Sequence, residues 1–382
     1  METRQIYLSC EMANRGHNVK VFTSTANHFL SSQPKKDEES FDRVTVHWLK
    51  TINYNKPYGF LRIISWFDFE LKLFLKLRKL ELQKSDIVIV SSLSLLSICN
   101  GVYLKKKFGC KLLFEIRDIW PLVLKRISNI SRYNPFYLFL QWLEKFGYKN
   151  ANLIIGSMPN LASHVKNVIS EPKKIIWVPH LINKRINYVS EHRYSTFFKQ
   201  IKLQFKEIVC YAGSINKSSG LEYLIQAFND DDLKDYALIL LGDGPQKEIL
   251  RKRHRFSNVF FFDKVPQKEV LAVLKDCDIL YDGYLKSKLY KFGTSRNKYV
   301  EYCLAAKPIL VSYQGYQIFV EQNQCGNVIE PESSKAIIQG ILKMASLNLK
   351  SRNKLGENAL KFAQDNLSVT AKVDEILECV KV

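Results

Sequence analysis

Residues 293–308 constrain this chain most, because their order of residue types predicts a loop, a helix, a stop and then a strand. Ser295 is a good N-cap residue, so Asn297 and Lys298 are expected in the first turn of the helix. Pro308 cannot continue that helix, and the apolar residues after it predict a strand. The stretch therefore predicts a helix whose first turn is positively charged.

The start of this predicted helix has the chemistry of a phosphate site. Helix N-termini present unpaired backbone N–H groups and a positive dipole end, and Lys298 adds a mobile positive charge. Glu301 lies on the same face as Asn297 and Lys298, where a carboxylate can accept hydrogen bonds from ribose hydroxyls. The alternative is an ordinary amphipathic helix with one internal Lys298–Glu301 pair.

The length and charge of the chain narrow the classes of protein to consider. With 382 residues the chain is long enough for two domains with separate cores. An apolar fraction of 46% and a charged fraction of 25% are typical of a globular protein. Lysine and arginine number 57 against 37 aspartate and glutamate, so the net charge is +20. This charge favours polyanionic partners: nucleic acid, an anionic membrane surface or phosphorylated substrates.

The cysteines and the apolar runs argue against several other classes. Eight cysteines are scattered without a CxxC pair, which argues against a zinc site and against a disulfide framework. No apolar leader is seen at the start, and no run of about eighteen apolar residues predicts a transmembrane helix. We therefore expect a cytoplasmic protein.

The first half alternates predicted strands and helices, which indicates a parallel sheet covered by helices on both faces. Strands are expected at 19–23, 44–49, 86–91, 110–116, 152–156 and 174–178, and helices at 6–14, 58–83, 94–108, 134–148 and 159–168. The chain opens on a helix, whereas an alternating α/β domain opens on a strand. We therefore expect this domain to lack its first strand.

The predicted helix at 58–83 mixes aromatic and basic side chains, such as those of Trp66, Phe67, Lys72 and Lys76. This mixture is typical of a helix that lies at a membrane interface. The alternative is a helix packed on the domain core with its basic face in solvent. In that case membrane contact is an additional role.

Ligands of parallel sheets bind beyond the carboxyl ends of the strands, and two loops at that place, at 115–121 and 157–160, carry unusual residues. In the loop at 115–121, Arg117 is a candidate for binding an anion, and Asp118 or Glu115 for binding a sugar hydroxyl. The alternative is a local Arg117–Asp118 ion pair that only fixes the loop.

Residues 183–206 are polar with little periodicity, and we interpret them as a linker between two domains. The second half again alternates, with predicted strands at 208–212, 236–241, 259–262 and 279–281. Four loops are expected on one side of that sheet, at 213–220, 242–245, 263–266 and 282–298. In the first loop, Asn216 and Lys217 are candidates for reaching a phosphate.

Short motifs along nearly the whole chain resemble the retaining glycosyltransferases of family 4, which have the two-domain GT-B architecture. In the first half they are Glu11-Met-Ala-Asn-Arg-Gly-His17, Phe114-Glu-Ile-Arg-Asp-Ile-Trp-Pro121 and Trp177-Val-Pro179. In the second half they are Tyr211-Ala-Gly-Ser214, Leu241-Gly-Asp-Gly-Pro245, Ser295-Arg-Asn-Lys-Tyr-Val-Glu301 and Ala305-Ala-Lys-Pro308. The Glu-x-Arg-Asp-x-Trp-Pro segment resembles bacterial surface-polysaccharide enzymes such as fucosamine transferases.

The resemblance implies an α/β fold with two Rossmann-like domains facing across a cleft. The acceptor-side domain is expected at 1–182, the nucleotide-sugar-binding domain at 207–350, and helices that cross back at 351–382. The implied donor is a UDP-linked sugar, and the implied acceptor is a lipid-linked molecule or a glycan in capsule, O-antigen or exopolysaccharide synthesis. We expect a peripheral location on the anionic inner face of the plasma membrane, without a metal, a cofactor or a specific nucleic-acid partner.

The resemblance also implies roles for individual residues, by matching position. The expected catalytic residues are Arg117, Asp118, Lys298 and Glu301. The expected donor-binding residues are Gly213, Ser214, Asn216, Lys217, Gly242, Lys264, Val265, Ser295, Asn297, Lys298 and Glu301. Among them, Glu301 is expected to hold the donor ribose and Lys298 the diphosphate, with the base near Lys264 and Val265.

The chain departs from the family pattern in three places. Gly293 occupies the position of the first glutamate in the family's Glu-x7-Glu pair. Ser214 and Ser219 stand in a loop where many relatives carry arginine and lysine, and Lys217 is a candidate replacement. The family's Gly-Gly loop is expected before residue 1. Two other hypotheses therefore stay open: a truncated, catalytically degenerate member with a binding role, and a sugar-nucleotide epimerase of the same fold, which Gly293 disfavours.

Overall fold

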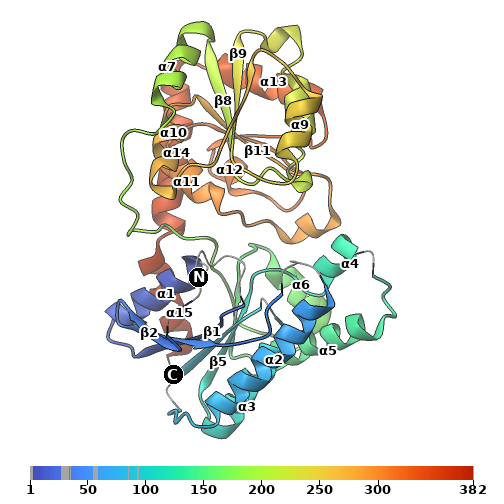
Figure 1. Ribbon diagram of the computed structural model, residues 1–382, viewed down its shortest axis with the longest axis vertical. Coiled ribbons are helices and arrows are strands. Elements are labelled where there is room, and N and C mark those ends of the chain that lie inside the picture. The colour runs from blue at the N-terminus through green and yellow to red at the C-terminus, as the bar shows by residue number, and fades with distance from the viewer. Residues whose placement is uncertain are drawn as a thin grey trace. The chain divides into compact units, whose positions relative to one another are not determined.

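The computed structural model describes residues 3–26, 34, 36–54, 59–84, 86–92, 94–128 and 130–381. The chain divides into two compact units: in Figure 1 the first runs from blue to green and includes the red C-terminal helix, and the second runs from green to orange-red. Unit 1 contains Met1–Leu181 and Val369–Val382, and unit 2 contains Ile182–Ser368. Each unit is an α/β sandwich with its own core.

Unit 1 alternates strands and helices in the order expected for a parallel α/β fold. Its helices are α1 (Thr3–Asn14), α2 (Phe60–Leu77), α3 (Ser97–Phe108), α4 (Leu122–Ser128), α5 (Pro135–Asn150), α6 (Leu161–Val168) and α15 (Val369–Val380). Its strands are β1 (Val19–Ser24), β2 (Glu38–Phe41), β3 (Val44–Leu49), β4 (Ile87–Ser91), β5 (Lys111–Ile116), β6 (Leu153–Gly156) and β7 (Ile175–Trp177).

The described strands of unit 1 form two sheets. One has the order β1-β3-β2, in which β2 runs antiparallel to β3, and the other has the parallel order β4-β5-β6-β7. Successive side chains of β5 point to opposite faces. Leu113 joins an apolar cluster with α1 and α15, whereas Phe114 lies against Gly147 of α5, where an added Cβ would be 2.5 Å from its ring. Helices therefore cover both faces of this sheet (Figure 1).

Unit 2 contains a single six-stranded parallel sheet in the order β10-β9-β8-β11-β12-β13. The strands are β8 (Glu207–Ala212), β9 (Tyr236–Leu241), β10 (Val259–Phe262), β11 (Ile279–Gly283), β12 (Ile309–Ser312) and β13 (Gly326–Ile329). The helices are α7 (Ser195–Gln204), α8 (Leu221–Ala227), α9 (Lys247–Arg253), α10 (Gln267–Lys275), α11 (Lys298–Leu304), α12 (Phe319–Gln322), α13 (Ser334–Ala345) and α14 (Leu349–Asn366). Because β8 lies between β9 and β11, its apolar run is buried on both faces.

The structure differs from the expected elements in several places. The helix expected at 58–83 is shorter, since α2 ends at Leu77, and Tyr58 lies outside the described residues. The short strand β2 and the helix α4 were not expected. The segment expected as a linker contains α7, whose Phe198 and Ile201 are buried in unit 2, so it is packed structure. The polar residues that alternate with these buried positions in α7 concealed this.

Candidate functional site

The expected donor-binding residues of unit 2 gather at one edge of its sheet. All six strands are parallel, so the loops that follow β8, β9, β10 and β11 leave the sheet at the same edge. These loops and α11 carry Gly213, Ser214, Asn216, Lys217, Gly242, Lys264, Val265, Ser295, Asn297, Lys298 and Glu301. The two other expected residues, Arg117 and Asp118, belong to unit 1.

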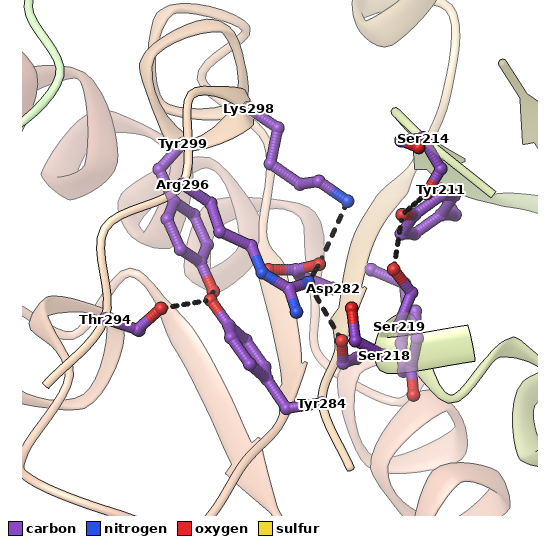
Figure 2. A network of polar contacts seen from close by, with 12 residues as sticks. Tyr211, Ser214, Ser218, Ser219, Asp282, Tyr284, Thr294, Arg296, Lys298 and Tyr299 are labelled. Carbon is purple, nitrogen blue, oxygen red and sulfur yellow. Dashed lines mark hydrogen bonds and ion pairs between the residues drawn. The ribbon is translucent and has the colours of Figure 1, made fainter. Parts of the chain in front are cut away.

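A buried carboxylate at the end of β11 organises the positive charge of this edge. The side chain of Asp282 is fully buried, and its Oδ1 accepts hydrogen bonds from Arg296 Nη1 at 2.6 Å and Lys298 Nζ at 3.0 Å (Figure 2). Burial alone would raise the pKa of Asp282, but the positive charges of Arg296 and Lys298 outweigh it and the pKa is lowered. Two basic side chains thus share one carboxylate, and the cluster carries an excess of positive charge.

Tyrosine rings hold both basic side chains in place. Lys298 Nζ lies 3.5 Å from the ring centroid of Tyr211, and Arg296 Cζ lies 3.5 Å from that of Tyr284. Figure 2 shows Tyr284 beside Tyr299, with 3.1 Å between the hydroxyl oxygens. Cation–π contacts of this kind are stronger where water is excluded, and all three tyrosines are buried. The orientation of the two cations is therefore fixed by the fold.

Lys298 also contacts the glycine loop that follows β8. A Cβ added to Gly213 would lie 3.0 Å from Lys298 Cε and 3.1 Å from its Nζ. Gly242, after β9, packs against the Gly213 carbonyl so closely that an added Cβ would lie 1.9 Å from the oxygen. Both glycines have a positive φ, which side chains rarely permit. Backbone of this kind next to a lysine is typical of a site for phosphate.

Glu301 lies three residues after Lys298 on α11. Its carboxylate is partly buried and accepts a hydrogen bond from Gln267 Nε2 at 3.2 Å. Burial raises the pKa of Glu301, and the hydrogen bond from Gln267 opposes the shift. The carboxylate retains acceptor positions for hydroxyl groups, as the sequence predicted for a ribose site.

The start of α11 differs from the prediction. The helix begins at Lys298 with Asn297 as its N-cap residue, and no side-chain hydrogen bond caps it. Ser295 is therefore not the cap, and Arg296 and Asn297 precede the helix. The cause is a long-range contact, because Arg296 Nη1 bonds Asp282 and the Gly283 carbonyl at 2.9 Å instead of extending the helix.

The loop after β8 is shaped by Asn216. Its Oδ1 accepts hydrogen bonds from Ser218 Oγ at 2.6 Å and Ser219 Oγ at 3.2 Å, and its Nδ2 donates to Ser214 Oγ at 3.4 Å. Lys217 begins the 3-10 turn Lys217–Ser219 with an exposed side chain. Asn216 thus supports the loop, and the exposed Lys217 is the loop residue placed to reach a ligand.

The two acidic residues at the end of β5 and in the loop after it differ in exposure. Glu115 is buried, forms an ion pair with Arg4 and accepts a hydrogen bond from Gln5 Nε2 at 3.0 Å. A sugar hydroxyl cannot reach a carboxylate enclosed in this way, so that expectation for Glu115 is wrong. Asp118 is exposed in the same loop.

The backbone around Arg117 is fixed by two hydroxyl groups. Its N–H donates to Ser92 Oγ at 3.1 Å, and its carbonyl accepts from Ser157 Oγ at 2.8 Å. Burial, followed by the charges of Arg4 and Arg117, lowers the pKa of His180 to about 3. A neutral imidazole therefore lies near these arginines at physiological pH.

Sequence reasoning did not assign a role to Asp282, Arg296, Tyr211 or Tyr284. Asp282 directly follows the apolar residues of β11, and an acidic residue at a strand end of a parallel sheet is a signal for a site. The partners of Asp282 lie at the far end of the long loop that follows β11 and at the start of α11, so the sequence alone does not join them.

Within the described ranges, no helix is both long and apolar enough to cross a membrane. The same residues contain no group of three histidine, cysteine, aspartate or glutamate side chains arranged to hold a metal ion.

Family models match both halves of the chain. The model of glycosyl transferases group 1 matches residues 194–362, and that of glycosyltransferase family 4 matches residues 1–185. A comparison with curated protein sequences gives no match.

Several solved structures are similar along most of the chain. Sucrose-phosphate synthase from Thermosynechococcus elongatus has a TM-score of 0.71 and 17% identity, covering 99% of this chain and 93% of that chain. A glycosyltransferase from Rickettsia africae ESF-5 has a TM-score of 0.67 and 15% identity, covering 98% and 93%. Anabaena HepE in complex with UDP-glucose has a TM-score of 0.59 and 15% identity, covering 88% and 86%. These likenesses show the fold, and with the family models they establish that the chain is a glycosyltransferase, a member of family 4 with two Rossmann-like units of the GT-B type.

Proposed function

We propose that the chain is a retaining glycosyltransferase that takes a UDP-linked sugar as its donor and binds it at the carboxyl edge of unit 2. Lys298 and the Gly213 loop hold the diphosphate, Glu301 holds the ribose, and the base lies near Lys264 and Val265. The UDP-glucose complex of Anabaena HepE supports the choice of nucleotide. Ser214, Asn216, Lys217, Gly242, Ser295 and Asn297 complete the proposed donor site.

The observation that carries this proposal is the position of the Lys298 ammonium. It lies beside the Gly213 backbone and is fixed by Asp282 at 3.0 Å. In sugar transfer the bond between the anomeric carbon and the diphosphate breaks, and negative charge accumulates on the leaving oxygens. A fixed cation at that place stabilises this charge without reorganisation. Glu301 lies close enough along α11 to recognise the nucleoside of the same donor.

We further propose that residues 1–182 form the acceptor side and residues 207–350 the donor side. The acceptor is a lipid-linked molecule or a glycan in the synthesis of capsule, O-antigen or exopolysaccharide, and the enzyme acts on the anionic inner face of the plasma membrane. Arg117 and Asp118, in the loop after β5, contact the acceptor and the transferred sugar. The Glu-x-Arg-Asp-x-Trp-Pro segment and the net charge of +20 support this assignment.

Donor binding provides the test. UDP binding, measured by calorimetry, is expected to weaken by about tenfold or more in Lys298→Ala, because a charged hydrogen bond to phosphate is lost. Glu301→Ala is expected to weaken UDP binding but not pyrophosphate binding. Lys335→Ala, an exposed residue of α13, is the matched control.

Product analysis separates the proposed reaction from the other hypotheses. A panel of nucleotide sugars with membrane extract as acceptor is expected to give transfer, with the anomeric configuration retained. An epimerase would change the sugar nucleotide without any acceptor. UDP binding that is equal in wild type and Lys298→Ala would refute the proposed site.

A further inference from the structure

The outer face of α2 is apolar where a surface helix is normally polar. Leu73 and Leu77 face the core and are 8% and 5% exposed. On the opposite side, four apolar side chains recur at helical spacing and are 48–60% exposed: Leu61, Phe67, Leu71 and Leu75. The helix is therefore apolar on the side that faces away from the protein as well as on the side that faces the core.

A second apolar surface lies on α5. Leu138 is 48% exposed and Trp142 is 54% exposed. Phe139, Trp142 and Phe146 stack in series, with ring centroids 6.1 and 5.3 Å apart and interplanar angles of 16° and 13°. Aromatic side chains with exposed rings are enriched where proteins meet the headgroup region of a bilayer.

The helix α3 contacts both α2 and α5, and the three helices lie on the side of unit 1 away from α1 and α15 (Figure 1). Among the side chains that the structure describes on these three helices, every exposed charged residue is a lysine. They are Lys72, Lys76, Lys106, Lys107, Lys145 and Lys149. We call the outer surface of α2, α3 and α5 the lysine–apolar face.

The helix α14 of unit 2 is a comparison within the same chain. It has 18 residues, as α2 does. Its exposed side chains after the first residue are polar or charged and carry both signs: Lys350, Asn353, Lys354, Glu357, Lys361, Gln364 and Asp365. Solvent exposure alone therefore does not explain the composition of the lysine–apolar face.

We propose that the lysine–apolar face docks on an anionic lipid bilayer. The leucines and Trp142 enter the boundary between headgroups and acyl chains, and the surrounding lysines contact the lipid phosphates. A second copy of the chain is a poorer fit, because two such faces would bring lysines of the same sign together. Only the purpose of the docking rests on the proposed function: it would bring unit 1 to a lipid-linked acceptor.

Vesicle flotation of the full chain tests the docking surface without any donor or acceptor. Binding is expected to vesicles that contain phosphatidylglycerol, with weaker binding to phosphatidylcholine alone. The double variant Leu71→Gln/Leu75→Gln is expected to bind roughly tenfold more weakly, because two apolar side chains that would enter the bilayer are replaced by polar ones. The matched control is Leu203→Gln/Leu349→Gln, which changes leucines of unit 2 that are 88% and 74% exposed. This control is expected to bind as the wild type does.

Two further measurements identify the surface independently. Trp142 is exposed, whereas the other four tryptophans are buried or half-buried, so a blue shift of the emission on binding that is lost in Trp142→Phe supports the proposal. Lys145→Gln/Lys149→Gln is expected to lower both the binding and its salt dependence.

Equal vesicle binding by wild type and Leu71→Gln/Leu75→Gln would overturn the assignment, and so would a wild type that does not bind anionic vesicles. A dimer in ultracentrifugation that the same double variant dissociates would point to a second copy instead. UDP binding is measured separately, so failure of the docking surface and failure of the donor site are distinguishable.

Discussion

Two carboxylates, Glu70 between α2 and α3 of unit 1 and Asp282 at the end of β11 of unit 2, have opposite surroundings. In unit 1, Glu70 of α2 accepts hydrogen bonds from the Ser97 hydroxyl and from Asn100 Nδ2 at 2.8 Å. Burial raises the pKa of Glu70 to about 7, although these hydrogen bonds oppose the shift. In unit 2, the pKa of Asp282 is lowered, because two basic side chains outweigh its burial.

The difference shows what each carboxylate does. Glu70 has neutral partners from α3, so it joins two helices and its ionised form is unfavourable. Asp282 has two charged partners, of which Lys298 also contacts Gly213, so it fixes the cation that the proposed diphosphate site requires. Glu70 therefore serves the packing of two helices in unit 1, whereas Asp282 arranges charge for a ligand in unit 2.

Asp282→Asn is expected to give the largest effect. The substitution leaves Arg296 and Lys298 partly buried without a counter-charge, which costs about 3–5 kcal/mol of unfolding free energy. Urea unfolding followed by far-UV circular dichroism measures this change. The control Asp365→Asn removes an exposed carboxylate of α14 and is expected to change little. Equal stability of the two variants would contradict a structural role for the Asp282 ion pairs.

Glu70→Gln is expected to act in the opposite direction and to depend on pH. The folded pKa of about 7 exceeds the ordinary value of 4.5, so the wild type is destabilised as pH rises through this window. The variant should match the wild type at pH 4 and exceed its stability at pH 8 by at most about 3 kcal/mol. A glutamine can accept from Asn100 and donate to Ser97, so both contacts persist.

Tryptophan fluorescence is a selective probe for this measurement, because all five tryptophans lie in unit 1. They are Trp48, Trp66, Trp120, Trp142 and Trp177. A stability difference between Glu70→Gln and wild type that is the same at pH 4 and pH 8 would break the comparison between the two carboxylates. The fluorescence reports the unfolding of unit 1, whereas Asp282 belongs to unit 2. If Asp282→Asn moves the midpoint of the fluorescence transition as far as Glu70→Gln does, the two units unfold together.

Much of this fold follows from the sequence. The predicted strands at 44–49, 236–241 and 259–262 coincide with β3, β9 and β10, because each is a short, mostly apolar run between polar or turn-forming residues. The strand β2 was missed because Glu38–Phe41 is mostly polar and exposed, as an edge strand can be. Local pattern is sufficient where a strand is a distinct apolar run, even at the sheet edge as in β10, and fails where the strand is polar, as in β2.

The candidate site was predicted only in part. Lys298 and Gly213 were singled out from their own motifs, and the structure places them in contact. The central role of Asp282 was not predictable, because its partners, Arg296 before α11 and Lys298 at its start, lie more than ten positions further along the chain. The same contacts displaced the predicted helix start, so a tertiary ion pair overrode the local signal of Ser295.

Lys298→Met is expected to have a smaller effect on stability, because Asp282 keeps Arg296 as a counter-charge. Loss of one charged hydrogen bond corresponds to about 1.5 kcal/mol. The double variant Asp282→Asn/Lys298→Met is expected to be more stable than Asp282→Asn alone, since one unpaired cation is removed. Strictly additive effects of the two substitutions would show that the carboxylate and the ammonium do not interact.

The smallest expected effects concern two asparagines at helix starts, and they sharpen the same contrast. Asn134 caps α5 of unit 1 and accepts from Phe136 N at 2.9 Å and Tyr137 N at 3.4 Å, so Asn134→Ala should cost about 1 kcal/mol. Asn297 precedes α11 of unit 2 without a capping hydrogen bond, so Asn297→Ala should leave circular dichroism melting almost unchanged while UDP binding weakens. A loss of stability in Asn297→Ala as large as that in Asn134→Ala would assign this asparagine to the fold, as in unit 1, and remove it from the proposed donor site.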